Sequence, residues 1–249
     1  MTASTVLLHI DSGVATLTLN RPETRNALNS AMCDDLLAGT RRVRDNPDVR
    51  AAFIRANGPV FCAGADLKER QGMDENAVRA RRLKAFSAYE AIERLPMPTI
   101  AVVTGAAIGS GCEIAAACDF IIATPVGSFR TPEALWGTVG ATQRLPRIIG
   151  KRLAKDMMFS GRTLKAEEAC AAGLVSRIVM PEALEGTLAE IANVIITAPP
   201  ESMRLAKRAI DQGVELDPRG ALATELLAIE ENLARKNWRN GIDSFGSRS

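Results

Sequence analysis

The first twenty positions of the chain contain two short apolar segments, and in the second of them apolar and polar residues alternate. Residues 6–10 read VLLHI and residues 14–20 read VATLTLN, with Asp11, Ser12 and Gly13 between them. A period of two is typical of strands with one buried face, and a short Asp-Ser-Gly connection is typical of a turn. The pattern therefore predicts a β-hairpin.

The spacing of apolar residues changes after this hairpin. Between Asn29 and Pro47 they recur at helical intervals, which predicts a helix that ends before the proline. From residue 49 onward, apolar strands, small-residue turns and helical segments follow one another. The pattern predicts strands at 49–56, 96–105 and 119–125, turns at 106–110 and 128–137, and helices at 111–118 and in the charged stretch ending near Arg94. This order predicts an α/β fold in which successive turns line up at one end.

The last third of the chain becomes helical. Thr163 is predicted to cap a helix that runs to Gly173, and residues 174–179 (LVSRIV) are predicted to form a strand. After residue 199 only helical patterns remain, and the last of these helices opens at Asp217. That helix is apolar around much of its circumference, so it either packs on its own core or forms a subunit interface.

Composition excludes several classes of protein. The chain has 249 residues, enough for one main core, with 31 Lys and Arg against 29 Asp and Glu, a net charge of +2. This balance gives no support for binding nucleic acid or an anionic membrane. We expect no partner of either kind. The start has no signal-peptide pattern and no apolar run spans a bilayer, so we expect a soluble protein of a reducing, cytoplasmic compartment.

Residue types also limit the chemistry. Five cysteines show no CxxC pair, and His9 is the only histidine. We therefore expect no metal site and no Ser-His or Cys-His catalytic pair. Carboxylates, backbone amides, lysines and hydroxyls remain.

Two turns rich in small residues, 62–66 and 109–111, each precede a helical segment. N–H groups at a helix start lack intrahelical partners, so two such turns side by side would form an oxyanion hole for a thioester. The alternative is that small residues merely permit close packing. A dinucleotide-binding GxGxxG signal is weak, because Ile114 occupies the place of the third glycine. Glu113 and Glu133 both follow turns in apolar surroundings, where a carboxyl with a raised pKa suits acid–base work.

Several segments in order resemble the enoyl-CoA hydratase/isomerase, or crotonase, superfamily. The similarity is carried by NRPETRNALN, FCAGADLKE, GAAIGSGCEIAAACDFIIA, RTPEALWG, TQRLPRIIG and FSGRTLKAEEACAAGLV. The resemblance implies a spiral core of repeated β-β-α units over residues 1–195. It also implies a C-terminal helical region, 196–249, that builds a homotrimer or a hexamer of two trimers.

The resemblance also implies roles for individual residues. The backbone N–H groups of Ala65 and Ser110 would hold the thioester oxygen, and Glu113 and Glu133 would be the catalytic pair that adds water to a 2-enoyl-CoA. No cofactor is implied beyond the coenzyme A of the substrate. Further positions expected at the substrate are Arg25, Ala63, Gly64, Asp66, Lys68, Gly109 and Trp136, of which Arg25 and Lys68 are candidates for the CoA phosphates. The alternatives for those two and for Trp136 are solvated charge and a core aromatic residue.

Other functions stay open at this point. The loop after Glu133, GTVGATQRL, is shorter than the loop that resembles it in family hydratases, and the acyl group can be short, medium or branched. A crotonase-like isomerase, decarboxylase or hydrolase is one alternative. A non-catalytic acyl-CoA-binding protein is another.

Overall fold

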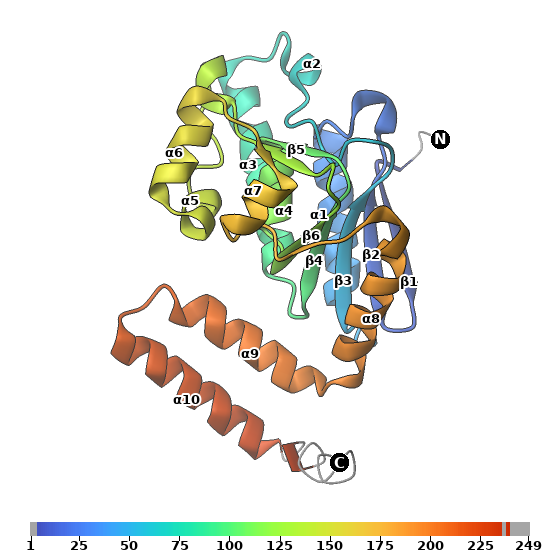
Figure 1. Cartoon of the computed structure of the whole chain (residues 1–249), viewed down its shortest axis with the longest axis vertical. Coiled ribbons are helices and arrows are strands. Elements are labelled where there is room, and N and C mark those ends of the chain that lie inside the picture. Colours follow the sequence, from blue (N-terminus) through green and yellow to red (C-terminus); the bar gives the residue numbers. More distant parts are fainter. Residues whose placement is uncertain (1–3, 236–237, 240–249) are drawn as a thin grey trace.

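A mostly parallel sheet of six strands is the centre of the molecule (Figure 1). The computed structural model describes residues 4–235 and 238–239. Along the sheet the strands are β1 (Val6–Asp11), β2 (Val14–Leu19), β3 (Ala51–Ala56), β4 (Thr99–Val103), β6 (Phe120–Ala123) and β9 (Arg177–Ile178). β1 and β2 form the predicted antiparallel hairpin, and every other neighbouring pair is parallel.

Three short strands form a second sheet, in the order β5 (Ala106–Ile108), β7 (Ser128–Arg130) and β8 (Leu164–Lys165). The chain passes from β4 in the large sheet to β5 in the small one and then into helix α4 (Ser110–Ala116), and it repeats this step from β6 to β7. These are the β-β-α units that the resemblance implied, and they bring the ends of β5 and β7 together.

Three local predictions were wrong in this region. Residues 106–110 and 128–137 are not simple turns, because each begins with a strand of the second sheet; three residues are too few to show a strand period. Thr163 does not cap a helix: it precedes β8, and α7 (Ala166–Ala171) begins after Lys165.

Helices cover both faces of the large sheet. α1 (Ser30–Arg44) and α3 (Glu75–Glu93) pack on one face, and α8 (Leu184–Thr197) packs on the other (Figure 1). Along β3 the residues alternate, so that Ile54 faces the first layer and Phe53 faces the second. As predicted, α1 begins after Asn29, whose side chain accepts a hydrogen bond from Met32 N at 2.9 Å, and ends before Pro47.

Shorter elements complete the core. They are η1 (Pro22–Thr24), α2 (Leu67–Arg70), η2 (Glu133–Trp136), α5 (Arg144–Ile149), α6 (Lys151–Ser160) and η3 (Pro181–Ala183). The charged stretch predicted to be one helical segment is therefore two helices, α2 and α3, with Gly72 in the break between them.

The last two described helices, α9 (Pro200–Gly213) and α10 (Pro218–Ala234), pack against each other beside the core (Figure 1). Asp217 caps α10 as predicted, and Lys207 Nζ lies 2.9 Å from Asp119 Oδ2, which fastens α9 to the core. The division into 1–195 and 196–249 stays a prediction, and residues 236–237 and 240–249 of its second part lie outside the described residues. Within the described chain, no helix combines the length and the apolar character needed to cross a membrane.

Candidate active site

Two turns from distant parts of the sequence lie against each other. Ile108 N donates to Cys62 O at 2.9 Å, which joins the end of β5 to the turn before α2. A Cβ on Gly111 would lie 2.5 Å from Cys62 O, and a Cβ on Gly64 would lie 3.2 Å from Ile108 O. Close packing thus accounts for these two glycines, as the alternative explanation proposed, and this packing is also what brings the two turns together.

Each turn presents a backbone donor. Among residues 4–235 and 238–239, the N–H groups of Ala65 and Ser110 have no hydrogen-bond partner, like those of Gly64 and Gly111, whereas those of Asp66 and Gly109 do. Asp66 N donates to Leu28 O at 2.8 Å, and Gly109 N donates to Arg130 O at 2.8 Å. Two unused donors at adjacent turns can bind one oxygen that carries negative charge.

Glu113 lies in the first turn of α4 and is 6% exposed. Its Oε2 accepts a hydrogen bond from Arg144 Nη1 at 2.9 Å, and Arg144 also pairs with Glu93 at 2.6 Å. Burial raises the pKa of Glu113, and Arg144 opposes that rise. The carboxylate is therefore both desolvated and held by a cation.

Glu133 opens η2 and packs on Gly109. A Cβ at Gly109 would lie 2.5 Å from Glu133 Oε1, and the backbone there has φ +51°, so only glycine fits both the space and the conformation. Glu133 Oε2 is buried with no hydrogen-bond partner in the described chain. Burial raises the pKa of Glu133, and the nearby charge of Glu113 raises it further.

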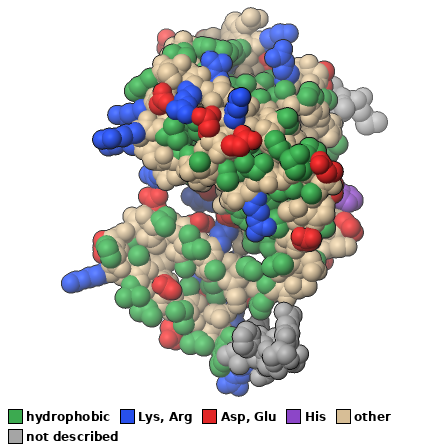
Figure 2. Space-filling model, viewed as in Figure 1, with side chains coloured by type: hydrophobic (Ala, Val, Ile, Leu, Met, Phe, Trp, Pro, Cys, Tyr) green, Lys and Arg blue, Asp and Glu red, His purple; other side chains and the backbone are tan. Residues whose placement is uncertain are grey.

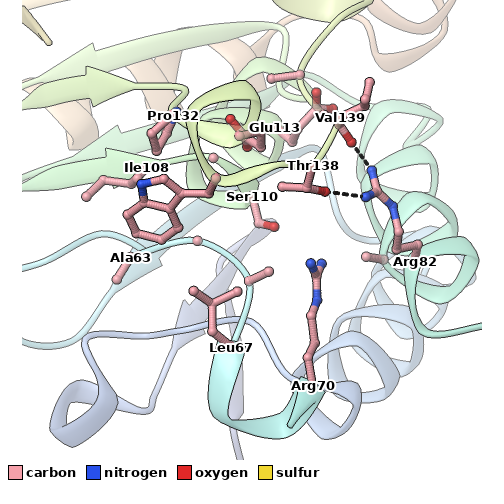
Figure 3. A pocket seen from close by; sticks show the side chains of 18 of the residues that line it. Ala63, Leu67, Arg70, Arg82, Ile108, Ser110, Glu113, Pro132, Thr138 and Val139 are labelled. Atoms are coloured by element: carbon pink, nitrogen blue, oxygen red, sulfur yellow. Dashed lines mark hydrogen bonds between the residues drawn. The ribbon is translucent and has the colours of Figure 1, made fainter. Parts of the chain in front are cut away.

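The loop at 137–141 contacts both glutamates. A Cβ at Gly140 would lie 3.2 Å from Glu133 Cγ, and the backbone of Ala141 helps to stabilise ionised Glu113. Arg82 of α3 holds this loop by donating to Thr138 Oγ1 at 2.7 Å and to Val139 O (Figure 3). The short loop after Glu133 is thus tethered by Arg82, contacts both glutamates and forms part of the cavity wall.

These groups border one cavity (Figure 3). Of the residues predicted from the sequence, its wall includes Ala63, Gly64, Ala65, Gly109, Ser110, Glu113, Glu133 and Trp136. Trp136 is 62% exposed, so the core-residue interpretation was wrong. Helices α2 and α3 supply the opposite side.

Three predicted residues lie outside that wall. Arg25 and Lys68 are exposed, so solvated charge describes them in this structure and their contact with phosphates stays a prediction. Arg25 O does accept a hydrogen bond from Ala63 N at 3.0 Å. Asp66 caps α2 and pairs with Arg21 at 3.0 Å, which positions the first turn.

The sequence interpretation missed the arginines of this site. Arg144 reaches Glu113 from α5, and Arg70 and Arg82 reach the cavity from α2 and α3. Arg70 and Arg82 lie in a charge-rich stretch, and Arg144 lies in the short helix RLPRII beside Arg147, so neither spacing nor composition separated them from surface arginines.

Comparison with known proteins identifies relatives of similar length. The family model described as enoyl-CoA hydratase/isomerase matches residues 9–248. The chain is 37% identical over 246 residues to enoyl-CoA isomerase/hydratase fer4 of Mycosarcoma maydis, with 94% of this chain and 90% of that protein covered. It is 35% identical over 249 residues to the short-chain-enoyl-CoA hydratase of Clostridium acetobutylicum, with coverage of 98% and 95%. The crystal structure of enoyl-CoA hydratase from Bacillus anthracis superposes with a TM-score of 0.94 at 34% identity and covers 98% and 96% of the two chains.

Proposed function

The chain belongs to the enoyl-CoA hydratase/isomerase family, and from this premise we propose that it adds water across the double bond of a short or medium, straight or branched 2-enoyl-CoA. One observation carries the proposal: Glu113 and Glu133 border the same cavity as the unused N–H groups of Ala65 and Ser110. A hydratase needs this combination, because it must stabilise an enolate and move two protons. The coenzyme A arrives with the substrate, and the proposed reaction uses no other cofactor.

The two backbone donors act on the thioester. When a nucleophile adds at Cβ, negative charge develops on the thioester oxygen, and each well-placed N–H stabilises that charge by roughly 3 kcal/mol in the transition state. Ala65 and Ser110 supply these donors from turns that are packed backbone to backbone. Little reorganisation is then needed as the charge forms.

The two glutamates divide the proton transfers. Arg144 stabilises the ionised form of Glu113, which suits Glu113 to take a proton from the attacking water. Glu133 has no such partner, and the charge of Glu113 favours its protonated form, which suits it to deliver a proton to Cα. The water oxygen bonds to Cβ, the double bond becomes the enolate, and the proton from Glu133 completes the hydrated product.

The test follows loss of enoyl-thioester absorbance with crotonyl-CoA. We expect hydration by the wild type and a drop in kcat of roughly 10²- to 10⁴-fold for Glu113→Gln and for Glu133→Gln. Glu90→Gln is the matched control, because Glu90 makes an exposed ion pair with Arg94 on the outer part of α3. Binding of crotonyl-CoA without any turnover by the wild type would contradict the proposal and favour a non-catalytic acyl-CoA-binding protein.

Isomerisation is the second candidate. One relative is named an isomerase as well as a hydratase, and the unpartnered Oε2 of Glu133 could carry a proton between two carbon atoms. A gain of enoyl-thioester absorbance from a 3-enoyl-CoA would support this reaction. It would require Glu133 and tolerate Glu113→Gln, whereas hydration requires both.

We also propose assembly into a homotrimer, or into a hexamer of two trimers, through the C-terminal helices. Hydrophobic side chains are exposed on this part of the molecule (Figure 2). On α10 they are Leu222, Leu226, Leu227, Ile229 and Leu233, which are 43–70% exposed. An apolar surface of this kind favours association with another protein surface. Sedimentation of the wild type and of Leu227→Glu tests this; a monomeric wild type would contradict it.

A further inference from the structure

The cavity wall opposite the glutamates carries three arginines with different surroundings. Arg81 pairs with Glu69 at 2.8 Å, and Arg82 holds the 137–141 loop. Arg70 makes no ion pair and no side-chain hydrogen bond with any residue in 4–235 or 238–239. It is the unmatched cation of this wall.

Arg70 is also partly removed from water. Its Nε is inaccessible to solvent, although nothing in the described chain accepts a hydrogen bond from it. Burial lowers the pKa of Arg70, and the neighbouring charges of Arg81 and Arg82 lower it further. A desolvated donor without a partner destabilises the folded protein, so a ligand that accepts a hydrogen bond from Arg70 would offset that cost.

The position of Arg70 indicates where that acceptor lies. The side chain extends from α2 into the space that Ser110 and Thr138 border (Figure 3). The turn with Ala65 immediately precedes α2, so a thioester oxygen at Ala65 and Ser110 would place the acyl group in the same cavity as the guanidinium. Apolar Ala85 and Phe86 line the cavity as well.

The two pocket glutamates do not fill this role. Glu113 already pairs with Arg144. Arg70 has only a minor influence on the pKa of Glu133, after burial, Glu113 and Arg82, and no hydrogen bond joins Arg70 to Glu133. The guanidinium is therefore available to a planar anion, and its fork of N–H donors matches a carboxylate.

We propose that Arg70 binds a carboxylate at the far end of the acyl group, so that the substrate class is a carboxylated 2-enoyl-CoA rather than a plain hydrocarbon one. This inference rests on the proposed function in one respect, namely that an acyl-CoA thioester occupies this cavity. It assigns Arg70 as the residue that determines acyl specificity.

The test compares two substrates of similar shape. The first is 4-carboxybut-2-enoyl-CoA, and the second is 5-methylhex-2-enoyl-CoA, in which an isopropyl group replaces the carboxylate. We expect kcat/KM of the wild type to favour the carboxylated substrate by roughly 10- to 100-fold, as a charge-assisted hydrogen bond predicts. Arg70→Met should abolish this preference, and Arg70→Lys should keep part of it.

The control variant is Arg79→Met. Arg79 is exposed on α3 and lies outside the cavity wall, and within the described part of the chain its side chain bonds only to Asn76. Arg79→Met removes one positive charge, as Arg70→Met does, and should leave the substrate ratio unchanged. An equal loss for both substrates in Arg70→Met would overturn the proposal, because Arg70 would then act on the CoA moiety or on Glu133. A wild type without preference would overturn it too.

Binding of unreactive analogues separates this inference from the proposed reaction. Calorimetry with 4-carboxybutanoyl-CoA and 5-methylhexanoyl-CoA should give the same Arg70-dependent preference without turnover. Preferential binding with no hydration would support the role of Arg70 while contradicting the proposed hydratase. Hydration of both substrates with no preference in either assay would support the proposed hydratase and contradict the role of Arg70.

Discussion

Helix α4 and the η2 turn each place a glutamate in one cavity, yet they hold it in different ways. Glu113 is on a regular helix and is paired with Arg144, which is itself anchored by Glu93. Glu133 is on a short 3-10 turn, rests on the Cα of Gly109 and has a buried oxygen without a partner. Electrostatic interactions therefore position the Glu113 carboxyl, and steric contact positions the Glu133 carboxyl. This difference also leaves them with different preferences for a proton.

Among changes that keep both glutamates, the largest effect should come from loss of the steric support of Glu133. Gly109→Ala would insert a Cβ 2.5 Å from Glu133 Oε1, so the carboxyl must move. A displacement near 1 Å lowers kcat by roughly 100-fold. Steady-state hydration assays measure this.

The control for that change is Gly173→Ala. Gly173 also has a positive φ, +80°, but nothing lies within 4 Å of its Cβ position and it lies after α7, away from the cavity. The Gly173→Ala variant should have a lower free energy of unfolding and an unchanged kcat. Equal kcat values in the two variants would show that steric contact does not position Glu133.

A smaller effect should follow from removing the cation beside Glu113. Arg144 lowers the pKa of Glu113 against the effect of burial, so Arg144→Met should raise that pKa further. The ionised fraction at neutral pH then falls, and we expect kcat/KM to fall roughly 10-fold at pH 7 as the acidic limb of its pH profile moves to higher pH.

Arg147→Met is the matched variant for this experiment. Arg147 is on the same helix, α5, but makes an exposed pair with Glu215 at 3.2 Å. Its pH profile should coincide with that of the wild type. An acidic limb that stays in place in Arg144→Met would argue against Glu113 as the base.

A smaller difference between the two glutamates is expected in how each affects the free energy of unfolding. The folded state raises the pKa of Glu133, so its charged form destabilises the protein above the pKa of the unfolded chain, and this penalty disappears as the pH falls below that value. Glu133→Gln should therefore raise the free energy of unfolding by about 1 kcal/mol at pH 8, and by less near pH 4. Glu113→Gln should gain less, because Arg144 loses a partner.

Thermal unfolding at both pH values measures the two variants together. About 1 kcal/mol corresponds to a Tm shift of about 2–4 °C for a chain of this size. A Glu113→Gln variant more stable than Glu133→Gln at pH 8 would contradict the expectation that charged Glu133 destabilises the fold more than charged Glu113.

The smallest effect concerns the loop between the glutamates. Arg82→Met removes the donors to Thr138 Oγ1 and Val139 O, and a loss of hydrogen bonds worth about 1 kcal/mol corresponds to a fall in kcat of roughly fivefold. The assay is crotonyl-CoA hydration, with Arg79→Met as the control from the same helix. No change in kcat would show that the loop keeps its position without this tether.

Sequence patterns predicted the elements whose formation depends on residues close together in the sequence. The alternation of apolar and polar residues in 14–20 corresponds to the one buried face of β2 and predicted this strand. Asn29 and Pro47 flank α1 and predicted where this helix begins and ends. The strands β5 and β7 were not predicted, because each is three residues long and pairs with a strand distant in the sequence.

The same reasoning applies to the site. The two glutamates and both small-residue turns stand out locally, since acids and glycines interrupt apolar runs. The ion pair of Glu113 with Arg144 joins residues 31 positions apart. The proposed role of Arg70 rests on its lack of a hydrogen-bond partner within the described chain. Neither property is encoded in a short stretch, because both follow from how the chain returns to the cavity.

The contact between the two turns limits how this protein can diverge. Since Gly64 meets Ile108 O and Gly111 meets Cys62 O, the separation of the Ala65 and Ser110 donors is set by main chain against main chain. Substitution cannot adjust that separation gradually, because a Cβ at Gly111 would lie 2.5 Å from Cys62 O, and Gly64 has φ +98°, which other residues rarely adopt. Descendants of this chain that acquire new substrates are therefore expected to keep these glycines and to accumulate changes in α2, α3 and the 137–141 loop.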